Sequence, residues 1–123
     1  MSTTETKNLL FVFDKAPHSS PAAKEGLDAL LTASAFGQNV TLLLIGDGIY
    51  QIMTNQDPSL LPSKNTAAIF QALDMYGIEK IVTLQSTLDE RNLTTADLTI
   101  ECGIISNDEI ADLYSAQQQI LSF

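Results

Sequence analysis

The sequence predicts an α/β domain in which helices cover both faces of a mostly parallel, five-stranded sheet. Short apolar segments alternate along the chain with segments of helical periodicity, an order typical of parallel strands joined by crossover helices. The apolar segments carry almost no polar residues, which indicates strands that are buried on both faces. We therefore expect a sheet with helices packed on each side.

The expected strands share an apolar composition and a length far below the roughly 18 apolar residues that span a bilayer. The first two are apolar nearly throughout, and the fourth lies somewhere within a mixed segment. In order, the strands are expected at residues 8–13, 40–45, 81–84, within 98–102, and at 119–123.

The first helix has clear start and stop signals. Ser20 stands in the position of an N-cap, and Pro21 follows at the first helical position, where its missing N–H costs nothing. The helix is expected to run to about Phe36, where Gly37 supplies a left-handed stop. Its inner stripe consists mostly of small residues, so it can lie close to the sheet: Ala23, Gly26, Leu27, Leu30 and Ala33.

The remaining helices are predicted from periodicity and from capping residues. A second helix is expected over 66–76, with Gly77 as its stop. Residues 87–90 have capping-box spacing and predict the start of a short helix or turn, and residues 106–109 repeat that spacing ahead of the last helix. The segment 54–65, which contains two prolines, is interpreted as a long surface loop.

The length of 123 residues fits one compact domain, expected over 8–123 after a disordered polar segment 1–7. That first segment lacks the basic start and apolar middle of a secretion signal, so we expect a cytoplasmic protein.

The formal net charge is −9, from 15 acidic and 6 basic residues, and the bases are scattered singly. Because nucleic acids and anionic membranes are bound through clustered bases, direct contact with either is not expected. The acidity favours solubility or the attraction of a basic partner.

The single cysteine and the single histidine limit the possible chemistry. One cysteine excludes an internal disulfide and a cysteine-based zinc site. A transition-metal site of the usual kind and a catalytic triad that needs histidine are not expected with one histidine. The residues alone therefore predict no metal, no cofactor and no catalytic residue.

Three loops follow strands at the edge where parallel sheets gather ligands: 14–20, 46–50 and 85–91. In the first loop, His18 and Ser19 precede a helix whose free amide groups can hold an anion or contact a partner. The glycine-rich phosphate-binding patterns are absent, so an ordinary capped helix start is the favoured interpretation.

The other two loops also have two interpretations each. Asp47 can bind a metal or act as a base, but its flanking glycines favour a tight turn, which presents Tyr50 to a neighbour. Near Arg91, the hydroxyl groups of Ser86 and Thr87 lack an activating base, so helix capping is favoured there.

Cys102 lies between Glu101 and Gly103 and is interpreted as a small residue within a strand. A reactive thiol needs exposure and a nearby cation or helix start, and a neighbouring carboxylate raises the pKa of a thiol instead. Cys102 is therefore only a weak candidate for a sulfur acceptor.

Several segments resemble the TusC/DsrF family within the DsrE-like superfamily. The most specific pair is Ala16-Pro-His18 followed by Glu25-Gly-Leu-Asp-Ala-Leu-Leu31. Shorter similarities from the second strand to the end of the chain extend the resemblance to about residues 8–123: Ile45-x-Asp47-Gly48-x-x-Gln51, Ile78-Glu79, Leu88-x-Glu90-Arg91-x-Leu93 and Ile120-Leu-x-Phe123.

The resemblance implies a three-layer, flavodoxin-like domain that assembles with TusB/DsrH-like and TusD/DsrE-like subunits as a dimer of heterotrimers. Separated from these partners, the chain is expected to self-associate or to be only marginally soluble. In that family the complex passes persulfide sulfur along a chain of cysteines. The Tus branch serves 2-thiouridine formation in tRNA, and the Dsr branch serves sulfur oxidation.

The resemblance also places the carrier cysteine of the TusD/DsrE-like subunit directly after the third strand, where this chain has Leu84 and Gln85. A leucine cannot hold sulfur, so the resemblance implies a non-catalytic subunit rather than an enzyme. The alternative is an independent flavodoxin-like small-molecule-binding protein or enzyme that uses the loops of His18 and Asp47.

Overall fold

The computed structural model describes residues 6–16, 22–53 and 69–123. Its strands form one five-stranded sheet in the order β4-β3-β2-β1-β5, and every neighbouring pair is parallel. The predicted α/β class with a parallel sheet is therefore confirmed. The strands are β1 Asn8–Phe13, β2 Asn39–Leu44, β3 Lys80–Leu84, β4 Gly103–Ile105 and β5 Gln119–Ser122.

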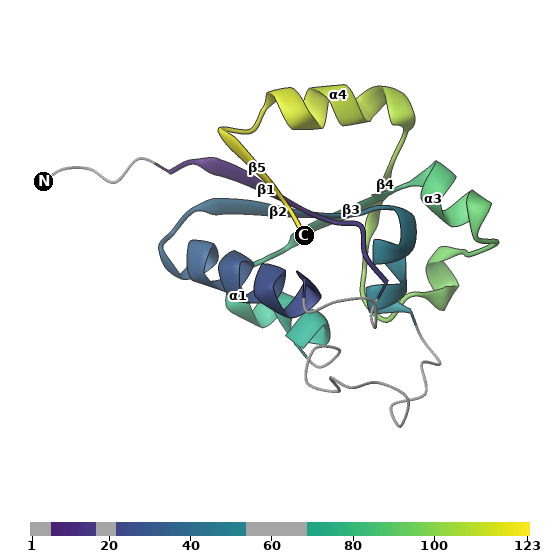
Figure 1. The fold of residues 1–123 in the computed structure, drawn as a ribbon, viewed down its shortest axis with the longest axis horizontal. Coiled ribbons are helices and arrows are strands. Elements are labelled where there is room, and N and C mark those ends of the chain that lie inside the picture. The colour runs from purple at the N-terminus through teal and green to yellow at the C-terminus, as the bar shows by residue number, and fades with distance from the viewer. Residues whose placement is uncertain (1–5, 17–21, 54–68) are drawn as a thin grey trace, which may run out of the picture.

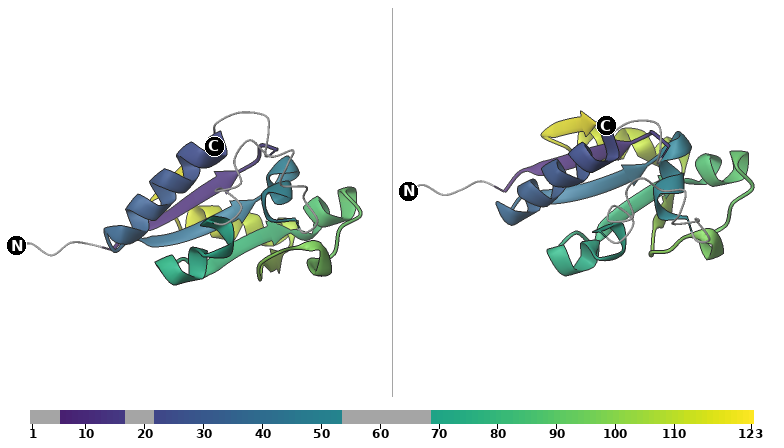
Figure 2. Two further views of the ribbon diagram at one scale, coloured as in Figure 1. Left: turned by 90° about the horizontal axis from the view of Figure 1, so that it is seen from below. Right: turned by 60° about the horizontal axis from the view of Figure 1, so that its bottom comes forward.

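Helices lie on both sides of this sheet (Figures 1 and 2). The helix α1 and the 3₁₀ helix η3 lie on one side, and α4 lies on the other. Two short elements, η1 and α3, follow directly after β2 and β3, and η4 lies between α3 and β4. Their bounds are α1 Ala22–Ala35, η1 Gly46–Ile52, η3 Leu73–Tyr76, α3 Gln85–Glu90, η4 Thr95–Asp97 and α4 Asn107–Ser115.

The main core lies on the α1 side of the sheet. Successive side chains of a strand point to opposite faces, so Phe11 and Phe13 of β1 enter this core. The rings of both phenylalanines pack against Phe123, with centroids 6.1 and 5.8 Å apart. The buried members of the core are Phe11, Phe13, Leu27, Leu30, Val40, Leu42, Leu44, Ile49, Ile52, Phe70, Leu73, Ile78, Ile81, Leu88 and Leu98.

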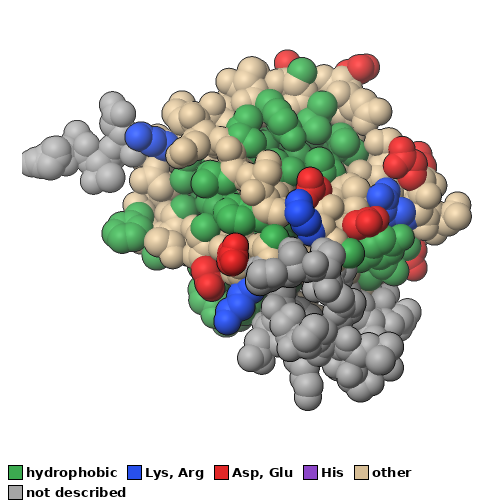
Figure 3. All heavy atoms as spheres, in the orientation of Figure 1, with side chains coloured by type: hydrophobic (Ala, Val, Ile, Leu, Met, Phe, Trp, Pro, Cys, Tyr) green, Lys and Arg blue, Asp and Glu red, His purple; other side chains and the backbone are tan. Residues whose placement is uncertain are grey.

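The core on the α4 side is much thinner. Its buried residues are Leu10, Val12 and Leu43, and α4 adds only half-buried side chains to it. All of α4 is described, and none of its residues is fully buried. Figure 3 shows apolar side chains gathered at the surface between α4 and β5. This side of the sheet is therefore covered less completely than the α1 side.

Two glycines allow close packing at the carboxyl end of β1. A Cβ atom on Gly26 of α1 would lie 2.6 Å from the ring of Phe13, so the small residue in the predicted inner stripe lets α1 approach the sheet. A Cβ atom on Gly48 of η1 would lie 1.9 Å from the backbone oxygen of Phe13. The start of η1 therefore rests directly on the backbone of β1.

Several predicted boundaries are confirmed. The first strand occupies residues 8–13 as predicted, and Gly37 and Gly77 have the expected left-handed conformation, with φ of 80° and 84°. The capping box before α4 is also present, since Ser106 Oγ accepts a hydrogen bond from the Glu109 amide at 3.3 Å.

The prediction of a fourth strand within 98–102 is wrong, because β4 begins at Gly103. Leu98 forms an isolated antiparallel bridge with Met53, and the Thr99 amide donates to the Ile52 carbonyl oxygen at 2.7 Å. This segment therefore pairs with the end of η1 and the residue that follows it. The edge strand of the sheet is formed by the residues after 102.

The predicted helix start at 87–90 is also wrong. The helix α3 begins at Gln85, immediately after β3, and Thr87 is buried inside it instead of capping it. The expected second helix is described only from residue 69, where a helical turn leads into the 3₁₀ helix η3. Ser20, Pro21 and the segments 1–5 and 54–65 lie outside the described residues.

We predict that Gly48→Ala destabilises the protein by about 3 kcal/mol or more, because the new methyl group collides with backbone rather than with a movable side chain. Chemical denaturation followed by circular dichroism measures this change in the free energy of unfolding. Gly103→Ala is the matched control, since its Cβ would meet Val82 at 3.4 Å, and we expect a loss below about 1 kcal/mol there. Equal stability of the two variants would contradict the packing described for η1.

Candidate functional site

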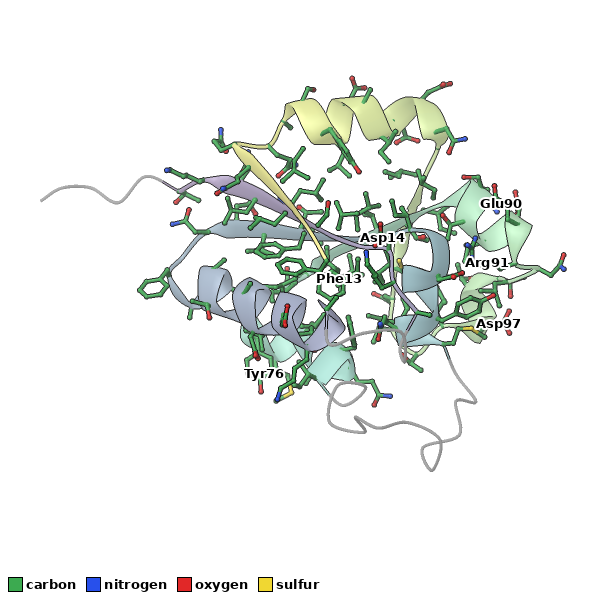
Figure 4. The ribbon with its side chains drawn as sticks, in the orientation of Figure 1. Phe13, Asp14, Tyr76, Glu90, Arg91 and Asp97 are labelled. Carbon is green, nitrogen blue, oxygen red and sulfur yellow. The ribbon has the colours of Figure 1, made fainter. Side chains whose placement is uncertain are left out.

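Arg91 joins the loops that follow β2 and β3 at the carboxyl edge of the sheet. Its Nη2 atom lies 3.2 Å from Asp47 Oδ1, in η1. Its Nη1 atom donates to the Thr87 carbonyl oxygen at 3.3 Å, and its Cζ atom lies 6.0 Å from the centroid of the Tyr50 ring. Figure 4 shows Arg91 and Glu90 at this end of the molecule, where α3 faces η1. The structure therefore brings together three predicted site residues.

The exposure of these groups limits the strength of the ion pairs. The side chain of Arg91 is 18% exposed, whereas those of Asp47 and Glu90 are 58% and 72% exposed. Ion pairs with such exposed carboxylates contribute at most about 1 kcal/mol. Arg91 Nε is buried without a hydrogen-bond partner among the described atoms, which costs part of the free energy gained from these contacts. Because the ion pairs are weak, packing of the buried arginine stem is its larger contribution.

A second polar contact closes the same edge between η1 and β1. Gln51 is buried, and its Nε2 atom donates to the Lys15 carbonyl oxygen at 3.2 Å. The Lys15 ammonium group in turn lies 2.8 Å from Asp14 Oδ1. The loop after β1 is therefore held to η1 through its backbone, and the sequence analysis did not single out Gln51 as a site residue.

The candidate residues of the first loop, His18 and Ser19, lie outside the described residues. Within the described ranges, no group of three or more His, Cys, Asp or Glu side chains is placed to hold a metal ion. The interpretation of Asp47 as part of a tight turn needs one change, because Gly46, with φ of 53°, leads into the seven-residue 3₁₀ helix η1.

Cys102 is not part of this edge of the sheet. It lies one residue before β4, so its interpretation as a strand residue is wrong. It is half-buried, and its thiol donates to the Gly103 carbonyl oxygen at 3.7 Å. Burial raises the pKa of the Cys102 thiol to about 12. The thiol is therefore neutral at physiological pH. It borders a groove that also contains Glu79 and Glu101.

Comparison with known proteins identifies the family. The model of the DsrE/DsrF-like family matches residues 7–123. The chain belongs to the DsrE/DsrF-like family. It is 38% identical over 115 residues to a protein named TusC homolog from Vibrio parahaemolyticus, covering 94% of this chain and 98% of that relative. A TusC homolog from Aliivibrio fischeri is 37% identical over 113 residues, covering 92% and 96%.

The DsrE/DsrF-like fold is also seen in a solved structure. The crystal structure of the ychN protein from Escherichia coli superimposes with a TM-score of 0.80, over 96% of this chain and 100% of that one. The identity is 18%, so this likeness concerns the fold alone. In the part of the chain that the structure describes, no helix is both long and apolar enough to cross a bilayer.

In this family member, Leu84 at the end of β3 and Gln85 at the start of α3 occupy the position where the resemblance places the carrier cysteine of the TusD/DsrE-like subunit. Leu84 is half-buried at the junction of β3 and α3. The Gln85 amide group donates to Asp89 Oδ1 at 2.8 Å, and Ser86 Oγ donates to Asn107 Oδ1 at 3.0 Å. The side chains of Gln85 and Ser86 are therefore hydrogen-bonded to residues of α3 and α4, and the position offers no thiol.

We predict that Arg91 and Asp47 are only weakly coupled in a double-mutant cycle. Replacing both with alanine should reveal an interaction of about 0.5 kcal/mol, because the carboxylate is largely exposed. Arg91→Ala alone should cost about 1–2 kcal/mol through lost packing and the lost hydrogen bond to Thr87. Glu90→Ala is the control, with a loss within about 0.5 kcal/mol. A coupling energy above about 2 kcal/mol would contradict this account.

We predict that alkylation of Cys102 by N-ethylmaleimide accelerates about tenfold per pH unit and reaches no plateau below pH about 10.5. The reason is that only the thiolate reacts, and the thiol pKa is about 12 in the folded protein. The rate is measured by mass spectrometry of intact protein. In denaturant the pKa should return to about 9.0, so the rate should level off near pH 10. A plateau below pH 9 in the folded protein would argue against burial of the thiol.

Proposed function

We propose that this chain is a non-catalytic subunit of a heteromeric sulfur-relay complex, in which TusB/DsrH-like and TusD/DsrE-like subunits are its partners. In this complex, persulfide sulfur passes through cysteines of the partners, and this chain supports and positions them. The observation that carries the proposal is the junction of β3 and α3, where Leu84 and Gln85 offer no thiol. The high pKa of Cys102 supports the same role.

Exposed apolar side chains support assembly with other subunits. At one end of α1 and η3, Phe36 is 73% exposed, Met75 is 84% exposed and Tyr76 is 55% exposed. Ser34 Oγ donates to the Tyr76 carbonyl oxygen at 2.9 Å, which holds these two elements together. Large apolar side chains grouped at a surface are typical of sites that contact another protein.

The acidic composition supports protein partners rather than RNA. With a net charge of −9, the chain repels a phosphate backbone. It therefore contributes to tRNA thiolation only through the partner subunits. The same relay can serve sulfur oxidation, and both processes place the chain in the cytoplasm. The alternative, a ligand site at the loops of His18 and Asp47, has less support because Asp47 already pairs with Arg91.

We predict that co-expression with the TusB-like and TusD-like partner subunits yields one complex. The chain should co-purify with both subunits and elute with them as a single peak in size-exclusion chromatography. A persulfide donor should then add a sulfur mass to the TusD-like subunit and none to Cys102, whose thiol is neutral. Intact-mass spectrometry reads both results, with Cys102→Ser as the control for adventitious modification. If the chain elutes as a monomer and binds neither partner subunit, the proposal is refuted. A persulfide on Cys102 would refute the non-catalytic role.

A further inference from the structure

A continuous groove lies on the α1 side of the sheet, toward the amino ends of β3 and β4. It consists of two adjoining hollows of about 590 and about 650 Å³. One hollow is bordered by η3, and the other extends along the segment that precedes β4 as far as Cys102. The two hollows share Glu79, Ile81, Thr99, Ile100 and Glu101, so they form one groove.

The floor of the groove is apolar. Phe70, Leu73 and Ile78 lie at its base and are at most 1% exposed, whereas Ile81, at 8%, and the half-buried Ile100 present apolar surface to it. The groove exists because residues 98–102 leave the sheet to pair with the segment after η1, as Leu98 does with Met53. An apolar side chain that entered from another molecule would therefore contact Ile81 and Ile100, which lie above the core of this chain.

The rim of the groove is acidic. Asp74, Glu79 and Glu101 are exposed, and each lines the groove. Among the described residues that line it, there is no Lys or Arg. The nearby Lys80 ammonium group donates to Asn39 Oδ1 at 3.3 Å and borders a different hollow. The described part of the lining therefore offers carboxylates around an apolar floor and contributes no base to neutralise them.

We propose that this groove is the docking site for a segment of a partner subunit that presents Lys or Arg beside apolar side chains. The inference rests on the proposed function and adds the surface and the chemistry of the contact. Apolar side chains fill the floor, and cations pair with the carboxylates of the rim. A second copy of this chain fits poorly, because each copy carries a net charge of −9.

Charge reversal on the rim tests the proposal. In the complex with the TusB-like and TusD-like subunits, Glu79→Lys with Glu101→Lys should raise the Kd at least about tenfold. The control is Asp28→Lys with Asp112→Lys, two exposed positions on α1 and α4 that do not line the groove and give the same change in net charge. The control should stay within about threefold of the wild type. Thermal melts of the isolated chains verify that both variants fold.

The outcomes of this measurement are distinct. If the wild type binds its partners and the rim variant binds as tightly as the control, the docking site is refuted while the proposed function stands. If the wild type binds neither partner, the proposed function fails and the docking site falls with it. If only the rim variant loses affinity, and higher salt weakens the wild type more than the rim variant, the docking site is supported.

A photo-cross-linker on the rim provides a second, independent test. Thr95 is exposed and borders the groove, so a benzophenone maleimide attached to Thr95→Cys in the Cys102→Ser background should cross-link, on illumination, to a partner peptide that contains Lys or Arg. The control probe is placed on α4 by Ser115→Cys in the same background, and should not capture that peptide. Cross-links from position 95 only to a second copy, or only to residues 54–68 of the same chain, would overturn the proposal.

Discussion

The close contact between two glycines and Phe13 at the end of β1 is the constraint on which the rest of this fold depends. Gly48 lets η1 rest on the Phe13 backbone, and Gly26 lets α1 rest on its ring. The same ring packs against Phe70 and Phe123, with centroids 5.9 and 5.8 Å away. The packing around Phe13 thus determines how closely α1, η1 and the C-terminal segment approach the sheet. The polar contacts at the carboxyl edge follow from that placement.

The described residues at the two ends of the sheet differ in how they are connected. At the carboxyl edge, where α/β proteins usually bind ligands, Arg91 and Gln51 connect the loops to each other. Toward the amino ends of β3 and β4, an apolar floor lies open between acidic side chains. The proposed docking site therefore lies away from the edge that fold analogy favours.

Local patterns were sufficient to predict most of the fold. Alternating apolar segments indicated the parallel sheet, and the glycines at 37 and 77 marked helix ends because only glycine adopts their left-handed conformation easily. The strand at 98–102 was misplaced because Leu98 pairs with Met53, a contact between distant segments that no local pattern reveals. For the same reason, Asp47 and Arg91, 44 residues apart, were candidates that could not be joined from sequence. The groove is formed between η3 and the segment before β4, which are distant in the sequence. No local pattern therefore predicts it.

The thin cover on the α4 side has a further consequence for the motions of the protein. With no residue fully buried, α4 is held by half-buried Ile110, Leu113 and Tyr114 and by its own capping box. Contacts of this kind give a low free energy of sub-global opening, so amide protons in α4 exchange with solvent sooner than those of β1 and β2. Helix α4 thus behaves as a loosely attached unit, while β5 and Phe123 beyond it stay anchored in the sheet and the main core.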